Sequence, residues 1–271
     1  MATVNVNSWQ EFLTAIAVSG DTVVLPEEAV WDANDFAPLG VLDDINWECE
    51  TVEGRGTIIR NIHLYAKIIR GSGYQYVNDL HLLDFIADGE PTYGGLFEGD
   101  YFFKGCKISG ILTNGYRWLI RNPSNVNKYI LDRCSINLEF QKETTGSIGI
   151  SDTPCNGSIY SRVQIKAPNA GDITHQPMEY CEVVYYYSNA SNKFASFYYT
   201  GCTVRGNFQG MQTTESWAGS WSGANSVYCI ESFPAGYTPK YPANFIGVTD
   251  AQLKDPAYLR NIGFPIAVVG G

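Results

Sequence analysis

The sequence predicts an all-β chain folded as a β-solenoid, in which short strands wind into coils that stack on one another. The first observation is an internal repeat. Eight short segments can be laid over one another, and their central positions are 62, 80, 106, 134, 161, 181, 202 and 229. The first seven centres are flanked by apolar or small residues three positions before and two positions after, and the eighth segment, Ser226-Cys229, is incomplete. Periods of roughly 20 to 30 residues without a helical pattern are typical of stacked coils, each buried by its neighbours.

The second observation is the composition. The 271 residues include 27 glycines and 18 tyrosines, and only 17% of them are charged. This composition suits short strands joined by tight turns. No linker interrupts the pattern, so we expect a single domain with an N-terminal cap at 1–25, a solenoid body at 26–248 and a C-terminal cap at 249–271. Long loops are expected to leave the body at 84–100, 110–128, 139–157, 165–177 and 205–225, and long loops on a regular scaffold often carry function.

The N-terminal cap is expected to be a helix that begins after Ser8. Ser8 and Glu11 have the spacing of a capping box, and Trp9 and Phe12 share one helical face. Gly20 and the residue after it end this pattern before the first strand. A solenoid needs such a plug, because an open terminal coil exposes unpaired backbone groups and bare core.

Five of the seven cysteines occupy the same slot of the repeat, namely Cys106, Cys134, Cys181, Cys202 and Cys229. Stacked coils would place them in a ladder inside the solenoid, about 4.8 Å apart. We expect free thiols packed as small hydrophobic groups, with disulfide pairing or a metal site as alternatives. Ser161 takes the slot in one coil, which a structural ladder tolerates and a ligand set does not. No metal and no cofactor are expected.

The C-terminal cap is expected to hold two short helices. Thr249 is placed to cap the first, and Asp255 followed by Pro256 is placed to begin the second, which ends near Gly263.

Both ends resemble those of a known class of protein. The stretch VTDAQLKDPAYLRNIGFPI, the helix SWQEFLTAI, Val30-Trp31-Asp32 and the segment Gly54-Arg55-Gly56-Thr57-Ile58 are similar to the corresponding parts of right-handed parallel β-helices. These are the pectate-lyase-like β-helices of bacterial surface proteins and tailed-phage virion proteins. The resemblance extends over the whole chain as a pattern. It implies a single-stranded right-handed parallel β-helix of the kind used in phage tail and capsid appendages.

Charge and hydropathy exclude some partners. The net charge is −10 and the 18 Lys and Arg are scattered, so we expect no nucleic-acid partner. No segment has the ~18 consecutive apolar residues of a membrane span, and the first residues lack a signal-peptide pattern. We therefore expect synthesis in the host cytoplasm, no membrane partner and a place in the virion.

The acidic residues Asp84, Asp88, Glu98 and Asp100 lie in and around one expected loop. β-helix enzymes use clustered carboxylates on the solenoid face, so these four are the residues that would carry catalysis or bind a cation. A solvated loop is the alternative. The Gly-His-Gly and Arg-Ile-Lys motifs of polygalacturonases are missing, and no residue is assigned a catalytic role.

Aromatic residues are the other candidates. Trp217 and Trp221 lie in a Gly- and Ser-rich loop, and Tyr186 and Tyr198 lie in tyrosine-rich strands whose alternation sends some rings outward. Exposed rings beside polar residues suit sugar stacking or a protein interface, with core packing as the alternative.

Two classes of function are compatible with these features. The first is a non-enzymatic structural or adhesive β-helix of a phage or phage-like particle, in contact with other virion subunits and with a host-surface glycan. The second is a polysaccharide-active lyase or hydrolase of the same fold, and a bacterial surface adhesin is a further alternative. A homotrimer is expected, because viral β-helices commonly form one.

Overall fold

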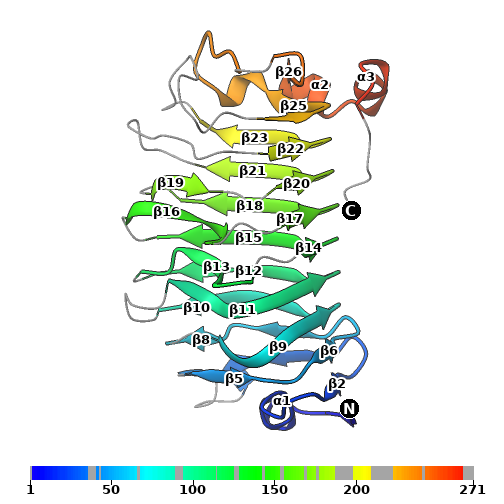
Figure 1. Cartoon of the computed structure of the whole chain (residues 1–271), viewed down its shortest axis with the longest axis vertical. Coiled ribbons are helices and arrows are strands. Elements are labelled where there is room, and N and C mark those ends of the chain that lie inside the picture. Colours follow the sequence, from blue (N-terminus) through cyan, green and yellow to red (C-terminus); the bar gives the residue numbers. More distant parts are fainter. Residues whose placement is uncertain are drawn as a thin grey trace.

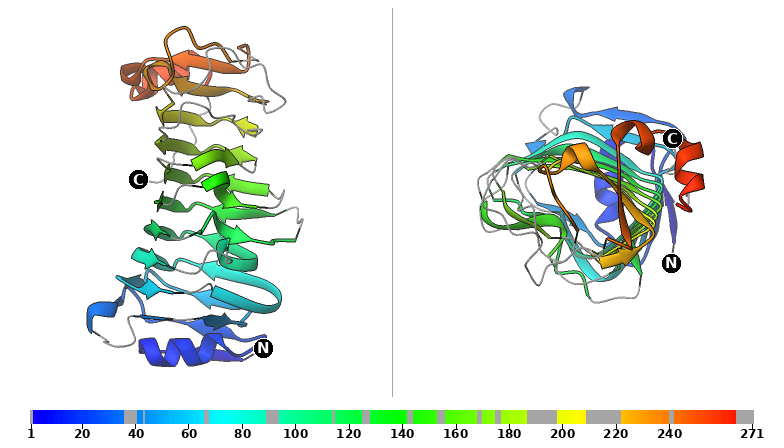
Figure 2. Two further views of the ribbon diagram at one scale, coloured as in Figure 1. Left: turned by 90° about the vertical axis from the view of Figure 1, so that its left-hand side faces the viewer. Right: turned by 90° about the horizontal axis from the view of Figure 1, so that it is seen from above.

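The computed structural model describes residues 2–35, 41–42, 44–65, 68–88, 94–113, 115–124, 128–141, 144–152, 156–167, 170–174, 177–186, 198–208, 222–239 and 242–264. The described strand pairs are parallel, and the coils stack along the long axis of the molecule, with helices near its two ends (Figure 1). Seen from above, the coils superpose around a common axis (Figure 2). The predicted β-solenoid is confirmed.

Sheet A follows one side of the solenoid. Its main path contains β1 (Thr3–Asn5), β2 (Thr22–Val24), β6 (Thr51–Glu53), β9 (Ile68–Asn78), β11 (Gly95–Lys104), β14 (Tyr129–Asp132), β17 (Asn156–Ile159), β20 (Met178–Glu179), β22 (Tyr198–Thr200) and β24 (Ser222–Ala224). A side branch pairs with the first halves of the long strands β9 and β11. It contains β5 (Ile45–Trp47), β13 (Trp118–Arg121), β16 (Thr144–Ser151) and β19 (Ala170–Thr174).

Sheet B follows the other side. It contains β3 (Val30–Asp32), β7 (Ile58–Arg60), β10 (His81–Ala87), β12 (Lys107–Leu112), β15 (Ser135–Phe140), β18 (Arg162–Lys166), β21 (Glu182–Tyr186), β23 (Thr203–Asn207), β25 (Ser226–Cys229) and β26 (Phe245–Val248), with β4 (Val41–Leu42) and β8 (His63–Leu64) beside it. The helices are α1 (Trp9–Ile16), α2 (Asp250–Leu253) and α3 (Pro256–Asn261), with 3-10 turns at Ala33–Asp35 and Ile230–Ser232.

A left-handed residue turns the chain from sheet A into sheet B in each coil. The strand registers align these corner residues in one column, and all have positive φ: Glu28, Gly56, Asp79, Gly105, Arg133, Tyr160, Tyr180, Gly201 and Asn225. The corner N–H donates to the coil stacked above. Gly105 donates to Asp132 O at 2.9 Å, and Tyr180 donates to Thr200 O at 2.8 Å. The ladder of backbone hydrogen bonds between coils therefore continues through the bend.

The corners correct the repeat alignment at both of its ends. Leu80 stands one residue after its corner, and the register places Thr57, not Ile62, beside it. Ser226, not Cys229, stands beside Cys202 in the same way. The predicted place of Cys229 in the ladder is therefore wrong. Thr57 and Ser226 fill the slot in these two coils with a hydroxyl residue, so a search for apolar or cysteine residues selects a nearby residue instead.

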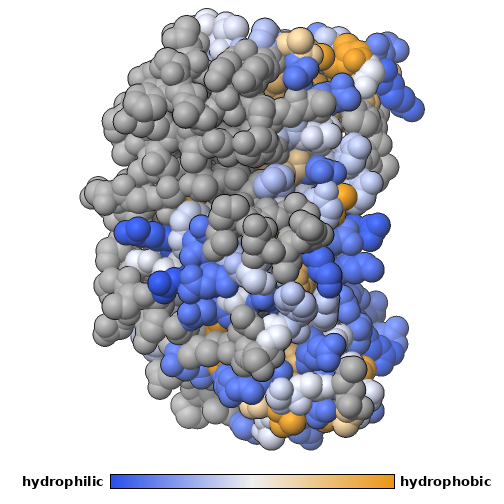
Figure 3. All heavy atoms as spheres, in the orientation of Figure 1, coloured by the Kyte–Doolittle hydropathy of each residue, from blue (hydrophilic) through white to orange (hydrophobic). Residues whose placement is uncertain are grey.

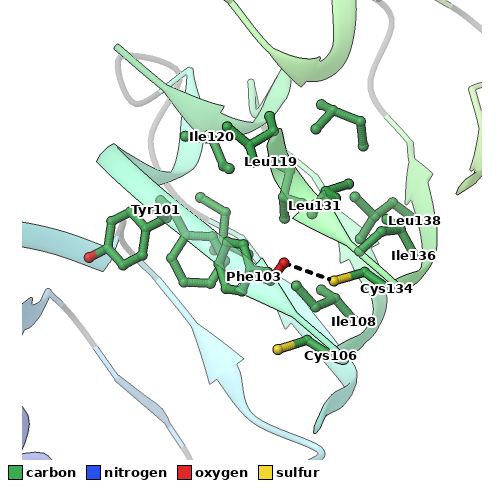
Figure 4. Packing of buried hydrophobic residues seen from close by; sticks show 14 of the residues in the cluster. Tyr101, Phe103, Cys106, Ile108, Leu119, Ile120, Leu131, Cys134, Ile136 and Leu138 are labelled. Carbon is green, nitrogen blue, oxygen red and sulfur yellow. Dashed lines mark hydrogen bonds between the residues drawn. The ribbon is translucent and has the colours of Figure 1, made fainter. Parts of the chain in front are cut away.

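The position after each corner favours Cys and Ser, because their side chains can form hydrogen bonds with nearby backbone N–H and C=O groups. The thiol of Cys134 donates to Phe103 O at 3.3 Å (Figure 4), and the backbone N–H of Cys134 donates to Ser161 Oγ at 3.0 Å. The backbone N–H of Cys202 donates to Ser226 Oγ at 3.1 Å in the same way. The six described cysteines are buried free thiols, and burial raises the pKa of the Cys134 thiol. The ladder is thus a column of small side chains bonded to backbone groups.

Short helices lie near both ends, and at the C-terminal end Leu259 of α3 packs with Val227 and Val248 in a cluster separate from the main core. Ser8 caps α1 by accepting from the Glu11 N–H, and Trp9 and Phe12 pack into the core against Trp31. At the other end, Thr249 and Gln252 form a reciprocal capping box on α2, and Asp255 caps α3.

Three segments expected to be long loops contain strands of the side branch. These segments are 110–128, 139–157 and 165–177, and they contain β13, β16 and β19 respectively. The sequence of β16, TTGSIGIS, has little side-chain alternation. Its strand conformation comes from backbone pairing with β13 and β19 rather than from local propensity.

Gly105 allows the corner conformation to be tested without steric interference. Its φ is +68°, and an added Cβ would meet only Asp79 backbone atoms at an ordinary 3.9 Å. Gly105→Asn should cost a few tenths of a kcal/mol, and Gly105→Val about 1–2 kcal/mol, because β-branched residues disfavour positive φ. Urea unfolding measures both variants. Equal losses would show that the corner conformation does not limit stability.

Cys134 provides the test of the slot. Cys134→Ser keeps the donor and should cost less than about 1 kcal/mol, whereas Cys134→Ala removes it and should cost about 1–3 kcal/mol. Cys134→Asp should prevent folding, because it buries an unpaired charge. The measurements are denaturant unfolding and the rate of thiol labelling. Rapid labelling of Cys134 in the native protein would contradict its buried position.

Candidate functional site

Strand β11 carries two of the predicted acidic residues, Glu98 and Asp100, where it passes from the side branch into the main path of sheet A. Asp84 lies in β10 of sheet B, and Asp88 directly follows that strand. The predicted acidic cluster is therefore divided between two sheets.

Asp84 and Asp88 are joined to the next coil of sheet B. Asp84 lies at a bulge with φ of 55°, where its N–H donates to Ser109 Oγ at 3.1 Å and its carboxylate accepts from the same hydroxyl at 3.3 Å. The Asp88 carboxylate accepts from the Thr113 hydroxyl at 2.6 Å. These contacts connect β10 to β12 and its continuation, which is a structural use of both carboxylates.

Glu98 belongs to a ladder of charged side chains on three stacked strands. Arg121 of β13 is the register partner of Glu98. Ser151 of β16 is the register partner of Ile120, so the residue that follows it, Asp152, stands beside Arg121. Asn122 connects the two acidic ends. Its backbone N–H donates to Asp152 Oδ1 at 2.8 Å, and its side-chain amide donates to Glu98 Oε1 at 3.4 Å. Charges of alternating sign thus lie side by side, and each side chain is partly exposed.

Asp100 holds the segment that follows β13. Only 5% of Asp100 is exposed, and its two carboxylate oxygens accept from the Ser124 N–H at 2.5 Å and from the Ser124 hydroxyl at 2.7 Å. Charge-assisted hydrogen bonds of this kind are strong. Asp100 therefore anchors Ser124 to β11, which is a positioning role.

An aromatic cluster lies beside Asp100 on the outward side of β9 and β11. Tyr74 and Tyr76 alternate with inward residues of β9, and Phe102 is the register partner of Tyr76 on β11. The rings of Tyr76 and Phe102 stack at 5.4 Å, and Tyr74 meets Phe102 edge-on at 5.7 Å. The Lys128 ammonium stands over all three rings. We call the surface formed by Tyr74, Tyr76, Phe102, Glu98, Arg121 and Asp152 the β9/β11 face.

Of the predicted aromatic binding residues, Tyr186 has a described side chain. Trp217 and Trp221 lie outside the described residues, as does the side chain of Tyr198, whose backbone belongs to β22. Tyr186 ends β21 of sheet B and is 44% exposed, between Lys166 and Asn207 in register. It is one of the outward rings that strand alternation predicts.

Sequence reasoning missed Tyr74, Tyr76, Arg121 and Lys128 as members of one surface. Tyr74 and Tyr76 left a signal, because the pattern Tyr-Gln-Tyr-Val places two tyrosines on the same side of a strand. The sequence contains no such signal for Arg121 and Lys128, since both lie in a segment expected to be a loop. The stacking of β13 on β11 brings Arg121 to this face, and the pairing of β14 with β11 brings Lys128, which directly precedes β14.

The β9/β11 face can bind by stacking and by hydrogen bonding. Tyr74 is 43% exposed on β9, and Glu98 and Arg121 lie on the neighbouring strands β11 and β13 of the same sheet. Rings stack on the apolar faces of sugars, while charged groups accept and donate hydrogen bonds to hydroxyls. In the view of Figure 3, the described surface is mainly hydrophilic with scattered apolar residues. Within the described residues, no group of three or more His, Cys, Asp or Glu is placed to hold a metal ion.

Comparison of this chain with protein-family models, with curated proteins and with solved structures gives no match. The resemblance to phage and pectate-lyase-like β-helices therefore rests on the sequence pattern alone. Among the described helices, none has the length and apolar character needed to cross a membrane.

Asp100 allows the positioning role to be tested. Asp100→Ala removes both acceptors of Ser124 and should lower the free energy of unfolding by about 1–3 kcal/mol. Asp100→Asn keeps one acceptor and should lose less. Urea unfolding gives the cost, and hydrogen exchange at the Ser124 amide reports the anchor itself. An unchanged exchange rate in Asp100→Ala would contradict this role.

Proposed function

We propose that the chain is a non-enzymatic adhesive β-helix of a bacteriophage or phage-like particle, in a tail fibre, spike or capsid appendage, and that the β9/β11 face binds a host-surface glycan. Other virion subunits and a homotrimeric assembly belong to the same proposal. The particle assignment is supported by the resemblance of the chain ends, and the binding surface by its geometry.

The observation that carries the binding proposal is the exposed ring of Tyr74 on the same sheet as the Glu98–Arg121–Asp152 ladder. The ring and the charged groups stand on paired strands, so their spacing is held by backbone hydrogen bonds. Sites on strands are more precisely positioned than sites on loops. A flat, long polymer such as a surface polysaccharide fits an open face of this kind better than a small enclosed ligand does.

The runner-up function is polysaccharide cleavage, and one observation favours it. Glu98 and Asp152 flank Arg121 at successive strands, which provides two carboxylates and a cation in one place. Acid–base cleavage of a glycosidic bond needs two carboxylates on opposite sides of that bond. In contrast, Asp84, Asp88 and Asp100 are each engaged in hydrogen bonds that join coils.

A glycan array and host-cell binding of the purified chain test the proposal. Tyr74→Ala and Arg121→Gln should each weaken binding by about 5- to 100-fold, as for a central contact residue, with the melting temperature nearly unchanged. Tyr186→Ala is the matched control, because this equally exposed tyrosine lies on sheet B. A loss of binding with Trp217→Ala or Trp221→Ala alone would move the contact surface away from the β9/β11 face.

The same preparation separates binding from catalysis. Bound polysaccharide should stay intact, with no new reducing ends or unsaturated products. Cleavage that disappears in both Glu98→Gln and Asp152→Asn would overturn the non-enzymatic proposal in favour of the runner-up.

A further inference from the structure

Three rings on the β9/β11 face surround a cation that the protein itself supplies. The Lys128 Nζ lies 5.3 Å from the ring centroid of Tyr74, 5.0 Å from that of Tyr76 and 5.4 Å from that of Phe102. The ring faces carry negative potential and attract a cation within about 6 Å. The rings of Tyr76 and Phe102 stack, and Tyr74 meets Phe102 edge-on, so the ammonium lies near all three rings.

We propose that Tyr74, Tyr76 and Phe102 form a binding site for an organic ammonium group, and that Lys128 is its internal, displaceable occupant. The site would take the charged amine of a partner molecule, such as an amino sugar or a quaternary ammonium substituent of a surface polymer. The proposal names a ligand class for the face assigned above and so rests on that assignment. The test measures ammonium binding by the rings and not adhesion to a glycan. The two proposals can therefore fail independently of each other.

The surroundings of Lys128 make displacement feasible. Its side chain is exposed, and it donates one hydrogen bond, to the Tyr76 hydroxyl at 2.6 Å. Among the described residues, no carboxylate forms an ion pair with it. A departing Lys128 would leave no buried charge unpaired, and its ammonium would be hydrated in water. An incoming ammonium could take the same contacts with the rings.

The rings themselves would stay in place when Lys128 leaves. Tyr74 and Tyr76 belong to β9 and Phe102 to β11, and these strands pair over the whole segment concerned. Phe102 is only 7% exposed. The site is therefore preorganised by sheet A, and its occupant comes from a separate segment, 52 residues from Tyr76 in the sequence. Preorganisation of this kind lowers the entropic penalty of binding.

The experiment uses NMR titration of the full chain with tetramethylammonium chloride, with sodium chloride at equal ionic strength as the blank. Lys128→Ala should bind at least about tenfold more tightly than the unmodified chain, because the internal competitor is gone. Lys104→Ala is the matched control, since this exposed lysine lies two residues from Phe102 on the same side of β11. It should bind like the unmodified chain. Adding Phe102→Ala to Lys128→Ala should abolish binding if melting shows that the double variant is folded.

A second arm distinguishes ligand sources and does not depend on a variant. Glucosamine and choline are titrated separately, and an amino-sugar ligand predicts the stronger response to glucosamine. In the unmodified chain, a saturating cation should release Lys128 and raise the rate at which its amine is acetylated, measured by mass spectrometry. The absence of saturable binding to Lys128→Ala would overturn the proposal. So would equal affinities of the Lys128→Ala and unmodified chains, because Lys128 would then merely tie its segment to sheet A.

Discussion

The structure depends on a single bend that each coil repeats, the left-handed corner between sheet A and sheet B. One residue reverses the sign of φ, and its N–H still donates to the next coil. For a residue with a side chain this conformation costs roughly 1–2 kcal/mol. The column nevertheless contains Arg133, Tyr160 and Tyr180. Their side chains offset part of that cost by stacking, with Tyr160 and Tyr180 at 5.4 Å and the Arg133 guanidinium 5.7 Å from the Tyr160 ring.

The corner also explains the residue after it. The bend leaves backbone groups that a small side chain with a donor and an acceptor can satisfy from inside the solenoid. Cys134, Ser161 and Cys202 do this in turn, each bonding to backbone of its own or a neighbouring coil. A cysteine or serine at this position is therefore set by backbone hydrogen bonding as much as by volume. An aliphatic residue fills the space but leaves the N–H of the previous coil without this acceptor.

The middle of the fold could be predicted from the sequence, and its ends could not. Cys106, Cys134, Cys181 and Cys202 repeat one side-chain type at one position, so the coils between them align correctly. Thr57 and Ser226 satisfy the same backbone groups with a hydroxyl, and a repeat defined by apolar character passes over them. The side branch was also missed. Strands such as β16 are held by backbone pairing with stacked neighbours, and such pairing leaves little trace in the local sequence.

In the candidate site, too, some features of single side chains could be predicted from the sequence and others could not. Glu98 and Asp100 could be named from their acidic neighbourhood, but their different roles follow from what the third dimension places beside them. Asp100 is buried and accepts hydrogen bonds from Ser124, while Glu98 is partly exposed and stands beside Arg121. Both partners come from the following coil, more than twenty residues away. In a solenoid, a functional surface is assembled from equal positions of successive coils. Its residues are recognised only once the register is known, and that register is set by the left-handed corners.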